Sequence, residues 1–323
     1  MSKDKKVMNE LKSLIYTQLS KKYNKCLWPK SDCTKDCINA HSIQNSQILD
    51  QLASNNHVFM AVAKQNLNTE REIEFKKVGR NKATTFTGLC REHDSQLFRP
   101  IDVNKFDSSN EEQKFLIAYR SVLRELHTRI KAARDLQTIC QKSVELGKCD
   151  PNNLEDPIML RATLALANAY DLYKYKYVYD KLYNSNSFTK IEHKCIRIER
   201  NCPLAVSSLF DPIKSIIVEK RPEPKFIVIN VFPQKKDTII LLSYLKDHQK
   251  DLRPYANEII NATGEDRLYL LSKTILRYCE NFVISLEHFN RFSEAKKDAI
   301  KKFYLATVTQ IDLDQDDENL MLF

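Results

Sequence analysis

The sequence predicts an α+β fold: an N-terminal module rich in cysteine and histidine, a long helical hairpin, and an antiparallel sheet with helices. Three observations support this prediction. Cysteines and histidines gather in two short segments of the first hundred residues, two long helical patterns follow, and β-type segments then precede helices without strand–helix alternation. We therefore divide the chain into residues 1–107, 108–186 and 187–310, with an acidic tail over 311–323.

Composition narrows the class of protein. The chain has 323 residues, a formal net charge of +9 and only four glycines. Because nucleotide phosphate loops need several glycines, the composition argues against ATPases, kinases and Rossmann dehydrogenases. The mild cationic excess suits a polyanion such as nucleic acid. No long uncharged apolar run and no secretory signal pattern occur, so we expect a cytoplasmic protein without membrane contact.

The N-terminal module is predicted to begin with an amphipathic helix over residues 1–23. Further elements follow from apolar periodicity: a helix over 42–53, strands over 57–64 and 72–78, and a helix starting at "REHDSQLF". The stretch "NKATTF", residues 81–86, could pair with either strand.

The middle of the chain reads as two long helices separated by "DPNNLEDP". Ser108 or Ser109 could cap the first, with Glu111 or Glu112 completing a capping box. The second carries six tyrosines interleaved with lysines, at positions 170, 173, 175, 177, 179 and 183. Such tyrosines could stack on a nucleic-acid strand. We favour the alternative that they pack along a helix interface while the lysines stay in solvent.

The last third has segments dense in isoleucine and valine, which predict strands over 192–199, 215–220, 225–233 and 237–245. The last two flank "PQKKD" as a hairpin. Helices are expected over 245–261, 265–285 and 293–306. The tail is acidic with an apolar end, and we expect it to be disordered.

Six candidate metal ligands occupy the first hundred residues: Cys26, Cys33, Cys37, His41, Cys90 and His93. Structural zinc takes four thiolate or imidazole ligands, usually as two local pairs. Cys90 and His93, spaced C-x-x-H, form one pair, and the other comes from among Cys26, Cys33 and Cys37. We expect a structural Zn²⁺, with free buried thiols as the alternative.

The same residues resemble a known family. A two-cysteine knuckle, "AHSI" entering a helix, strands, and "LC-x-x-H-D" at a second helix are similar to the ββα-metal (HNH) nuclease module with a treble-clef zinc frame. The pattern looks closest to an uncharacterised bacterial group sharing C…C, "AHSIQ" and "GLC..HD". The likeness covers residues 24–98 and is vague beyond them. It implies Cys26, Cys33, Cys90 and His93 as zinc ligands, with Cys37 as a spare.

The resemblance also implies catalytic residues. His41 matches the general base that deprotonates the attacking water, and Asp94 falls where the family holds a catalytic Mg²⁺ or Mn²⁺. Two positions depart from the family pattern. Ala40 stands where active enzymes commonly have a second metal ligand, and Thr85 stands where an orienting asparagine is expected, with Asn81 and Asn45 as possible substitutes.

Two functions follow from these expectations. The first is a metal-dependent endonuclease that hydrolyses nucleic-acid phosphodiesters, for which bacterial defence is one setting. The alternative is a non-catalytic zinc module that binds nucleic acid or a protein partner, and oligomerisation through the central helices or the C-terminal domain is a further expectation. Basic residues near the site would hold a phosphate backbone: Lys76, Lys77, Arg80, Lys82 and Arg91.

Overall fold

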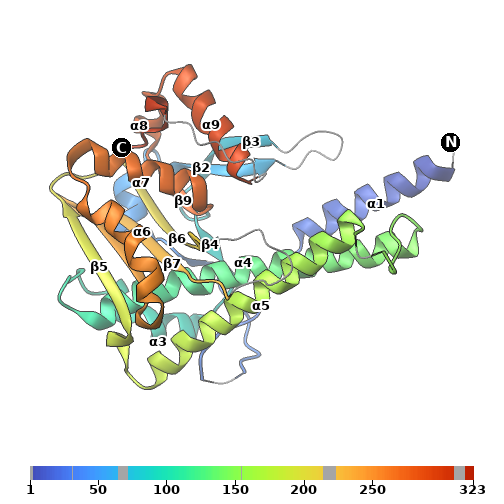
Figure 1. Cartoon of the computed structure of the whole chain (residues 1–323), viewed down its shortest axis with the longest axis horizontal. Helices are drawn as coiled ribbons and strands as arrows, with labels where there is room; N and C mark the ends of the chain where they lie inside the picture. Colours follow the sequence, from blue (N-terminus) through green and yellow to red (C-terminus); the bar gives the residue numbers. More distant parts are fainter. Residues whose placement is uncertain (1–2, 31, 65–71, 154, 214–222, 309–316) are drawn as a thin grey trace.

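The structure is a computed structural model and describes residues 3–30, 32–64, 72–153, 155–213, 223–308 and 317–323 (Figure 1). Its α-helices are α1 Lys3–Ser20, α2 Asp50–Leu52, α3 Arg91–Asp102, α4 Glu111–Glu145, α5 Pro157–Asn184, α6 Gln249–Asn261, α7 Gly264–Tyr278, α8 Leu286–Asn290 and α9 Glu294–Val308. Its strands are β1 Ala40–His41, β2 His57–Lys64, β3 Glu72–Gly79, β4 Thr85–Phe86, β5 Ile191–Ile198, β6 Leu204–Phe210, β7 Ile227–Pro233, β8 Thr238–Leu245 and β9 Phe282–Ile284. Among the described residues, no helix is both long and apolar enough to cross a membrane.

The core of the fold is a seven-stranded antiparallel sheet in the order β3-β2-β9-β6-β7-β8-β5. The expected hairpin around "PQKKD" is confirmed as β7 and β8. Strands β2 and β3, from the first hundred residues, join the sheet where Phe59 pairs with Ile284 of β9. The sheet thus runs across the expected division between residues 1–107 and 187–310, and that division stays a prediction.

Two strands differ from the sequence-based expectation. The stretch 265–285 is not one helix: α7 ends at Tyr278, and Phe282–Ile284 forms β9. These three residues are fully buried between β2 and β6, a position that favours aromatic and β-branched side chains. Strand β6 was not expected at all, and the strand expected over 215–220 lies outside the described residues.

Helices cover both faces of the sheet, as the layers in Figure 1 show. Leu204 and Val206 of β6 pack in one core with α6, α7 and α9. Leu209, further along β6, packs in a second core with α4 and α5. Because both faces are covered, every residue of β6, β7 and β8 is buried.

The expected helical hairpin is confirmed as α4 and α5, although a different residue caps α4. Asp107 Oδ1 accepts hydrogen bonds from the backbone N–H and the hydroxyl of Ser109, at 2.8 and 2.7 Å. Asn110 therefore becomes the cap and accepts from the Gln113 N–H at 3.0 Å. The far end of the hairpin projects from the sheet together with α1 (Figure 1).

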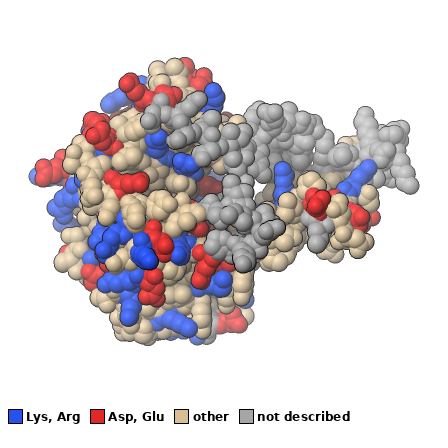
Figure 2. Space-filling view, viewed as in Figure 1, with Lys and Arg blue, Asp and Glu red and all other residues tan. Residues whose placement is uncertain are grey.

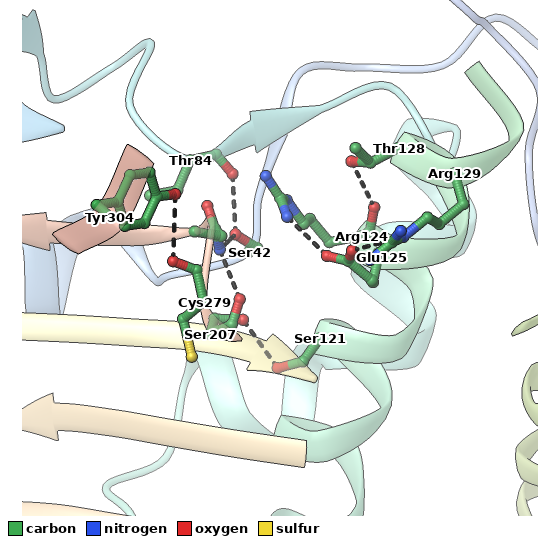
Figure 3. A network of polar contacts seen from close by, with 11 residues as sticks. Ser42, Thr84, Ser121, Arg124, Glu125, Thr128, Arg129, Ser207, Cys279 and Tyr304 are labelled. Atoms are coloured by element: carbon green, nitrogen blue, oxygen red, sulfur yellow. Dashed lines mark hydrogen bonds and ion pairs between the residues drawn. The ribbon is translucent and has the colours of Figure 1, made fainter. Parts of the chain in front are cut away.

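A buried polar network joins the segment after β1 to the sheet and to α4 (Figure 3). The fully buried Asn281 donates from Nδ2 to Ser42 Oγ at 2.9 Å and to the Ser207 carbonyl at 2.7 Å. The Ser207 hydroxyl lies 2.8 Å from the Ser121 hydroxyl on α4. Ser42 follows His41 directly, so this network helps to fix the candidate site described below.

The end of the tail is ordered against the C-terminal helices, so the expectation of a disordered tail is wrong for residues 317–323. Leu320 and Leu322 are buried. The Leu322 N–H donates to Ser272 Oγ at 2.9 Å, and its carbonyl accepts from His288 Nε2 at 2.9 Å. Burial of two leucines outweighs the polar composition that suggested disorder. The acidic stretch 311–316 lies outside the described residues.

Replacing Leu322 with alanine should lower the free energy of unfolding by about 2–5 kcal/mol, because it empties a fully buried site. Urea denaturation measures this change. Glu318→Ala, at an exposed position of the same segment, is the control and should change stability by less than about 0.5 kcal/mol. Equal stabilities for the two variants would show that the tail is not docked.

Candidate functional site

The structure brings the four expected metal ligands together. The ligand atoms of Cys26, Cys33, Cys90 and His93 all lie within 4.8 Å of one another. Cys26 Sγ is 3.4 Å from His93 Nδ1, and Cys33 Sγ is 3.9 Å from Cys90 Sγ. Three thiols and one imidazole at these separations can hold a metal ion.

Backbone pairing brings the two halves of this group into contact. Cys26 pairs with Cys33, and Cys37 pairs with Cys90, as isolated antiparallel bridges. Cys90 is the N-cap of α3, so His93 lies in the first turn of that helix. Glycine at position 88 leaves room for the Phe86 ring, because a Cβ there would lie 2.7 Å from it.

His93 is held in place by an aromatic neighbour. The Trp28 ring stacks on the imidazole with 4.3 Å between centroids and 6° between planes. Trp28 is itself buried and meets the Tyr183 ring of α5 edge-on at 6.2 Å. The stacking fixes the plane of the imidazole, so that Nδ1 faces the thiols.

The protonation of the thiols depends on their surroundings. Burial raises the pKa of Cys26 to about 12, so without a metal this side chain stays a neutral thiol. At Cys33 a hydrogen bond from the Lys35 backbone lowers the pKa, which favours the thiolate. Burial raises the pKa of Cys37 to about 11, and its Sγ is not part of the four-ligand group. Cys37 therefore acts through its backbone pairing with Cys90.

His41 lies on a two-residue strand next to this centre. β1 pairs with β4, and His41 stands opposite Thr85. The expected pairing of the stretch 81–86 with β2 or β3 is not found. Its first four residues form a turn closed by Gly79 and by Thr84, at φ +57°, and only Thr85–Phe86 form a strand, which pairs with β1. The expected helix over 42–53 is replaced by a single π-type turn, Asn45–Leu49, and the short α2.

The imidazole of His41 is oriented by a main-chain group. Its Nε2 lies 3.1 Å from the Arg80 carbonyl oxygen. A carbonyl can only accept, so Nε2 carries the proton and Nδ1 keeps its lone pair. Burial lowers the pKa of this half-buried side chain; the hydrogen bond to the Arg80 carbonyl acts in the opposite direction, and the charges of Arg120 and Arg80 add to the lowering. The neutral ring at neutral pH can therefore accept a proton at Nδ1.

Asp94 lies one residue after His93, in the first turn of α3. Burial raises the pKa of its carboxyl group, while the nearby Arg120 acts in the opposite direction. Arg120 donates from Nη2 to both carboxylate oxygens of Asp102, at 2.9 and 2.8 Å. His41 and Asp94 are thus both electrostatic neighbours of Arg120. In the part of the chain that the structure describes, no second group of three metal-binding side chains forms around Asp94.

The Arg80 carbonyl makes the contact with His41 that was expected of an asparagine. Thr85 Oγ1 donates to the Lys82 carbonyl at 2.9 Å, and Asn81 accepts from Asn45 at 2.9 Å. Within the described part of the chain, none of these three side chains hydrogen-bonds to His41. This contact could not be predicted from the sequence, because every residue has a backbone carbonyl and no side chain marks the one that accepts.

The five basic residues expected near the site lie on three segments. Lys76 and Lys77 are exposed on β3, Lys82 follows in the turn, and Arg91 begins α3. Arg80 forms an ion pair with Asp50. Figure 2 shows basic and acidic side chains interspersed over the face in view, without a broad basic field. A role for these residues in binding nucleic acid stays a prediction.

Comparison with known proteins identifies no relative. No protein-family model matches the chain, and no match to it was found among curated proteins or solved structures. The function therefore has to be inferred from the geometry of the site.

NMR titration should give His41 a pKa below 6.5 and a neutral ring protonated at Nε2, because burial disfavours the charged form. Since its pKa is lower in the folded chain, His41 stabilises the fold above about pH 6.5 and loses this contribution as pH falls through the lowered pKa. A pKa above 6.5 would contradict the effect of burial, and a neutral ring protonated only at Nδ1 would contradict the hydrogen bond to the Arg80 carbonyl.

Proposed function

We propose that Cys26, Cys33, Cys90 and His93 bind a structural Zn²⁺ in a treble-clef-like frame. The supporting observation is the fit of the group to a tetrahedral ion. With Zn–S of about 2.3 Å and Zn–N of about 2.0–2.1 Å, a tetrahedron has S–S edges of about 3.8 Å and S–N edges of about 3.6 Å. One S–S separation here, Cys33 to Cys90, is 3.9 Å, and one S–N separation, Cys26 to His93, is 3.4 Å; all six separations are within 4.8 Å.

The ion would join two segments that lie far apart in the sequence, since Cys26 is separated from Cys90 by 64 positions. In the described part of 21–39 the backbone forms isolated bridges and no longer strand or helix. Because the unfolded chain has no preformed site, the free energy of zinc binding adds to the free energy of folding. A bound ion would also replace the thiol proton that burial favours at Cys26.

On this frame we propose a metal-dependent endonuclease of the HNH-like type, with His41 as general base. The observation that carries the proposal is the orientation of the neutral His41 ring, with Nε2 bound to the Arg80 carbonyl and Nδ1 left to take a proton. Strands β1 and β4 followed by α3 also give the order of elements in a ββα-metal module, with His41 on the first strand and Asp94 in the helix.

The chain's own residues would divide the chemistry between them. His41 Nδ1 takes the proton of a water molecule that attacks a phosphodiester. The Asp94 carboxylate is the oxygen ligand available for Mg²⁺ or Mn²⁺. Such an ion, when bound, supplies positive charge for the scissile phosphate and the leaving oxygen.

One observation favours a second function, a non-catalytic zinc module that binds nucleic acid or a protein partner. Ala40, buried beside His41, offers no ligand, and within the described residues Asp94 gains no partner ligands. A site with a single carboxylate binds Mg²⁺ weakly unless the substrate phosphate completes it. Cleavage assays decide between the two functions.

Purified protein should contain one zinc ion per chain, and Cys90→Ser should lose it, because a four-ligand site tolerates no missing thiolate. Cys37→Ser, at the neighbouring thiol outside the group, is the matched control and should keep its zinc. Elemental analysis by mass spectrometry measures both. Zinc retained by Cys90→Ser, or lost by Cys37→Ser, would show that the ligands are assigned wrongly.

His41→Ala should reduce Mn²⁺-dependent cleavage of DNA or RNA by about 10²–10⁴-fold while leaving zinc content unchanged, because only the general base is removed. His57→Ala on β2 is the control for loss of a histidine outside the site. Cleavage that persists in His41→Ala excludes the assigned base. Salt-sensitive binding without cleavage by the unmodified protein would favour the second function instead.

A further inference from the structure

Helix α5 presents three tyrosines to solvent. Tyr170, Tyr173 and Tyr177 are 61%, 54% and 51% exposed, whereas Tyr175 and Tyr179 are buried in the core beneath them. The expectation that the six tyrosines of this helix pack along an interface is therefore right for Tyr175 and Tyr179, and for Tyr183, whose partly buried ring meets those of Trp28 and Tyr119. It is wrong for Tyr170, Tyr173 and Tyr177. Large aromatic side chains left in solvent on a long helix point to a binding surface.

The three exposed rings form one stripe, which we call the tyrosine stripe. Intervals of three and four residues place Tyr170, Tyr173 and Tyr177 within an arc of about 60° on the helix surface. At a rise of about 1.5 Å per residue, the stripe extends over about 10 Å. Leu160 and Leu164 are also exposed, but they lie about 100° or more away from the centre of the stripe.

Two lysines line one flank of the stripe. Lys174 Nζ lies 5.4 Å from the centroid of the Tyr170 ring, and Lys181 Nζ lies 4.6 Å from that of Tyr177. The side chain of Asp171, which pairs with Lys174, is only 13% exposed, against 44% for the lysine. The charge that the stripe presents to solvent is therefore positive.

The stripe is directed toward the metal centre. Beyond Lys181, the C-terminal end of α5 contacts the first knuckle, where Asn184 Nδ2 donates to the Pro29 carbonyl at 3.4 Å. There the exposed Lys30 places its Nζ 5.8 Å from the rings of both Trp28 and Tyr183. Aromatic rings and lysines thus continue from the middle of α5 to the side chain that stacks on His93.

We propose that the tyrosine stripe, with Lys174 and Lys181, binds single-stranded nucleic acid. Unpaired bases stack on the three rings and the ammonium groups contact the phosphates, a combination that binds single strands with little sequence preference. Duplex DNA hides its base faces and cannot use the rings. Binding of the nucleic acid does not depend on the proposed function. Only its purpose does, which would be to lead the bound single strand toward the metal centre.

A second copy of the chain fits this surface less well. Two helices that pack between copies of a chain favour aliphatic side chains at their interlocking positions. On the face of α5 that carries the stripe, the exposed large apolar residues are three tyrosines and one aliphatic residue, Leu166. Two copies packed through the stripe would also bring their flanking lysines toward each other. A polyanion instead satisfies the lysines and the rings together.

The test measures binding of fluorescein-labelled 20-nucleotide oligo-dT and a mixed-sequence RNA by anisotropy, in the His41→Ala background so that cleavage plays no part. Replacing Tyr170, Tyr173 and Tyr177 together with alanine should weaken binding by at least about 100-fold, roughly fivefold per lost stack. Phenylalanine at the same three positions should restore binding, because the rings remain. Lys174→Gln and Lys181→Gln should each reduce the salt dependence by about 0.7 in the slope of log K against log salt.

Leu160→Ala with Leu164→Ala is the matched control, since both residues are exposed on another face of α5. This double variant should bind like the parent, and circular dichroism should show α5 intact in every variant. Absence of binding by the parent protein overturns the proposal, as does equal loss in the leucine variant. A triple alanine variant that binds normally but changes only the oligomeric state assigns the stripe to a second copy instead. Because cleavage is not measured, failure here leaves the role of His41 untouched.

Discussion

The thiol and imidazole group at Cys26, Cys33, Cys90 and His93 is the constraint on which the site depends. The described residues of the loop before β1 form isolated bridges and no longer strand or helix, so regular local structure alone does not fix the loop. The cysteines of this loop meet Cys90 and His93, which lie more than fifty positions later in the chain. Closing so long a loop costs conformational entropy, which metal–ligand bonds can offset. Helix α3 then packs on α4, where the Arg120 guanidinium lies 4.1 Å from the centre of the Phe98 ring.

The position of His41 follows from this arrangement. Pairing of Ile38 with Leu89 at 2.9 Å continues directly into the pairing of β1 with β4, so the centre sets the register of the strand that carries His41. On the other side, Ser42 is held by Asn281. The histidine is therefore fixed from two directions, and its ring is turned by the Arg80 carbonyl. Such a fixed position suits the general base that we propose.

Sequence predicted the features that local spacing encodes. The C-x-x-H spacing at Cys90 identified half of the metal group, and apolar periodicity located α4, α5 and β2. Features that depend on partners distant in the sequence were not predicted. β9 has three residues and forms only because β2 and β6 leave room between them. Leu322 looks like the end of a polar tail until its burial and its hydrogen bond to Ser272 are known. The zinc frame, the catalytic role of His41 and the strand-binding surface remain proposals built on these positions.

X-ray absorption at the zinc edge tests the central claim most directly, because it reads the ligands of the bound ion without any substitution. The account predicts three sulfur neighbours at about 2.3 Å and one nitrogen neighbour at about 2.0 Å. A set of four sulfurs would mean that Cys37 replaces His93 and that Trp28 stacks on a histidine outside the site. That result, or a folded protein without zinc, would contradict the account.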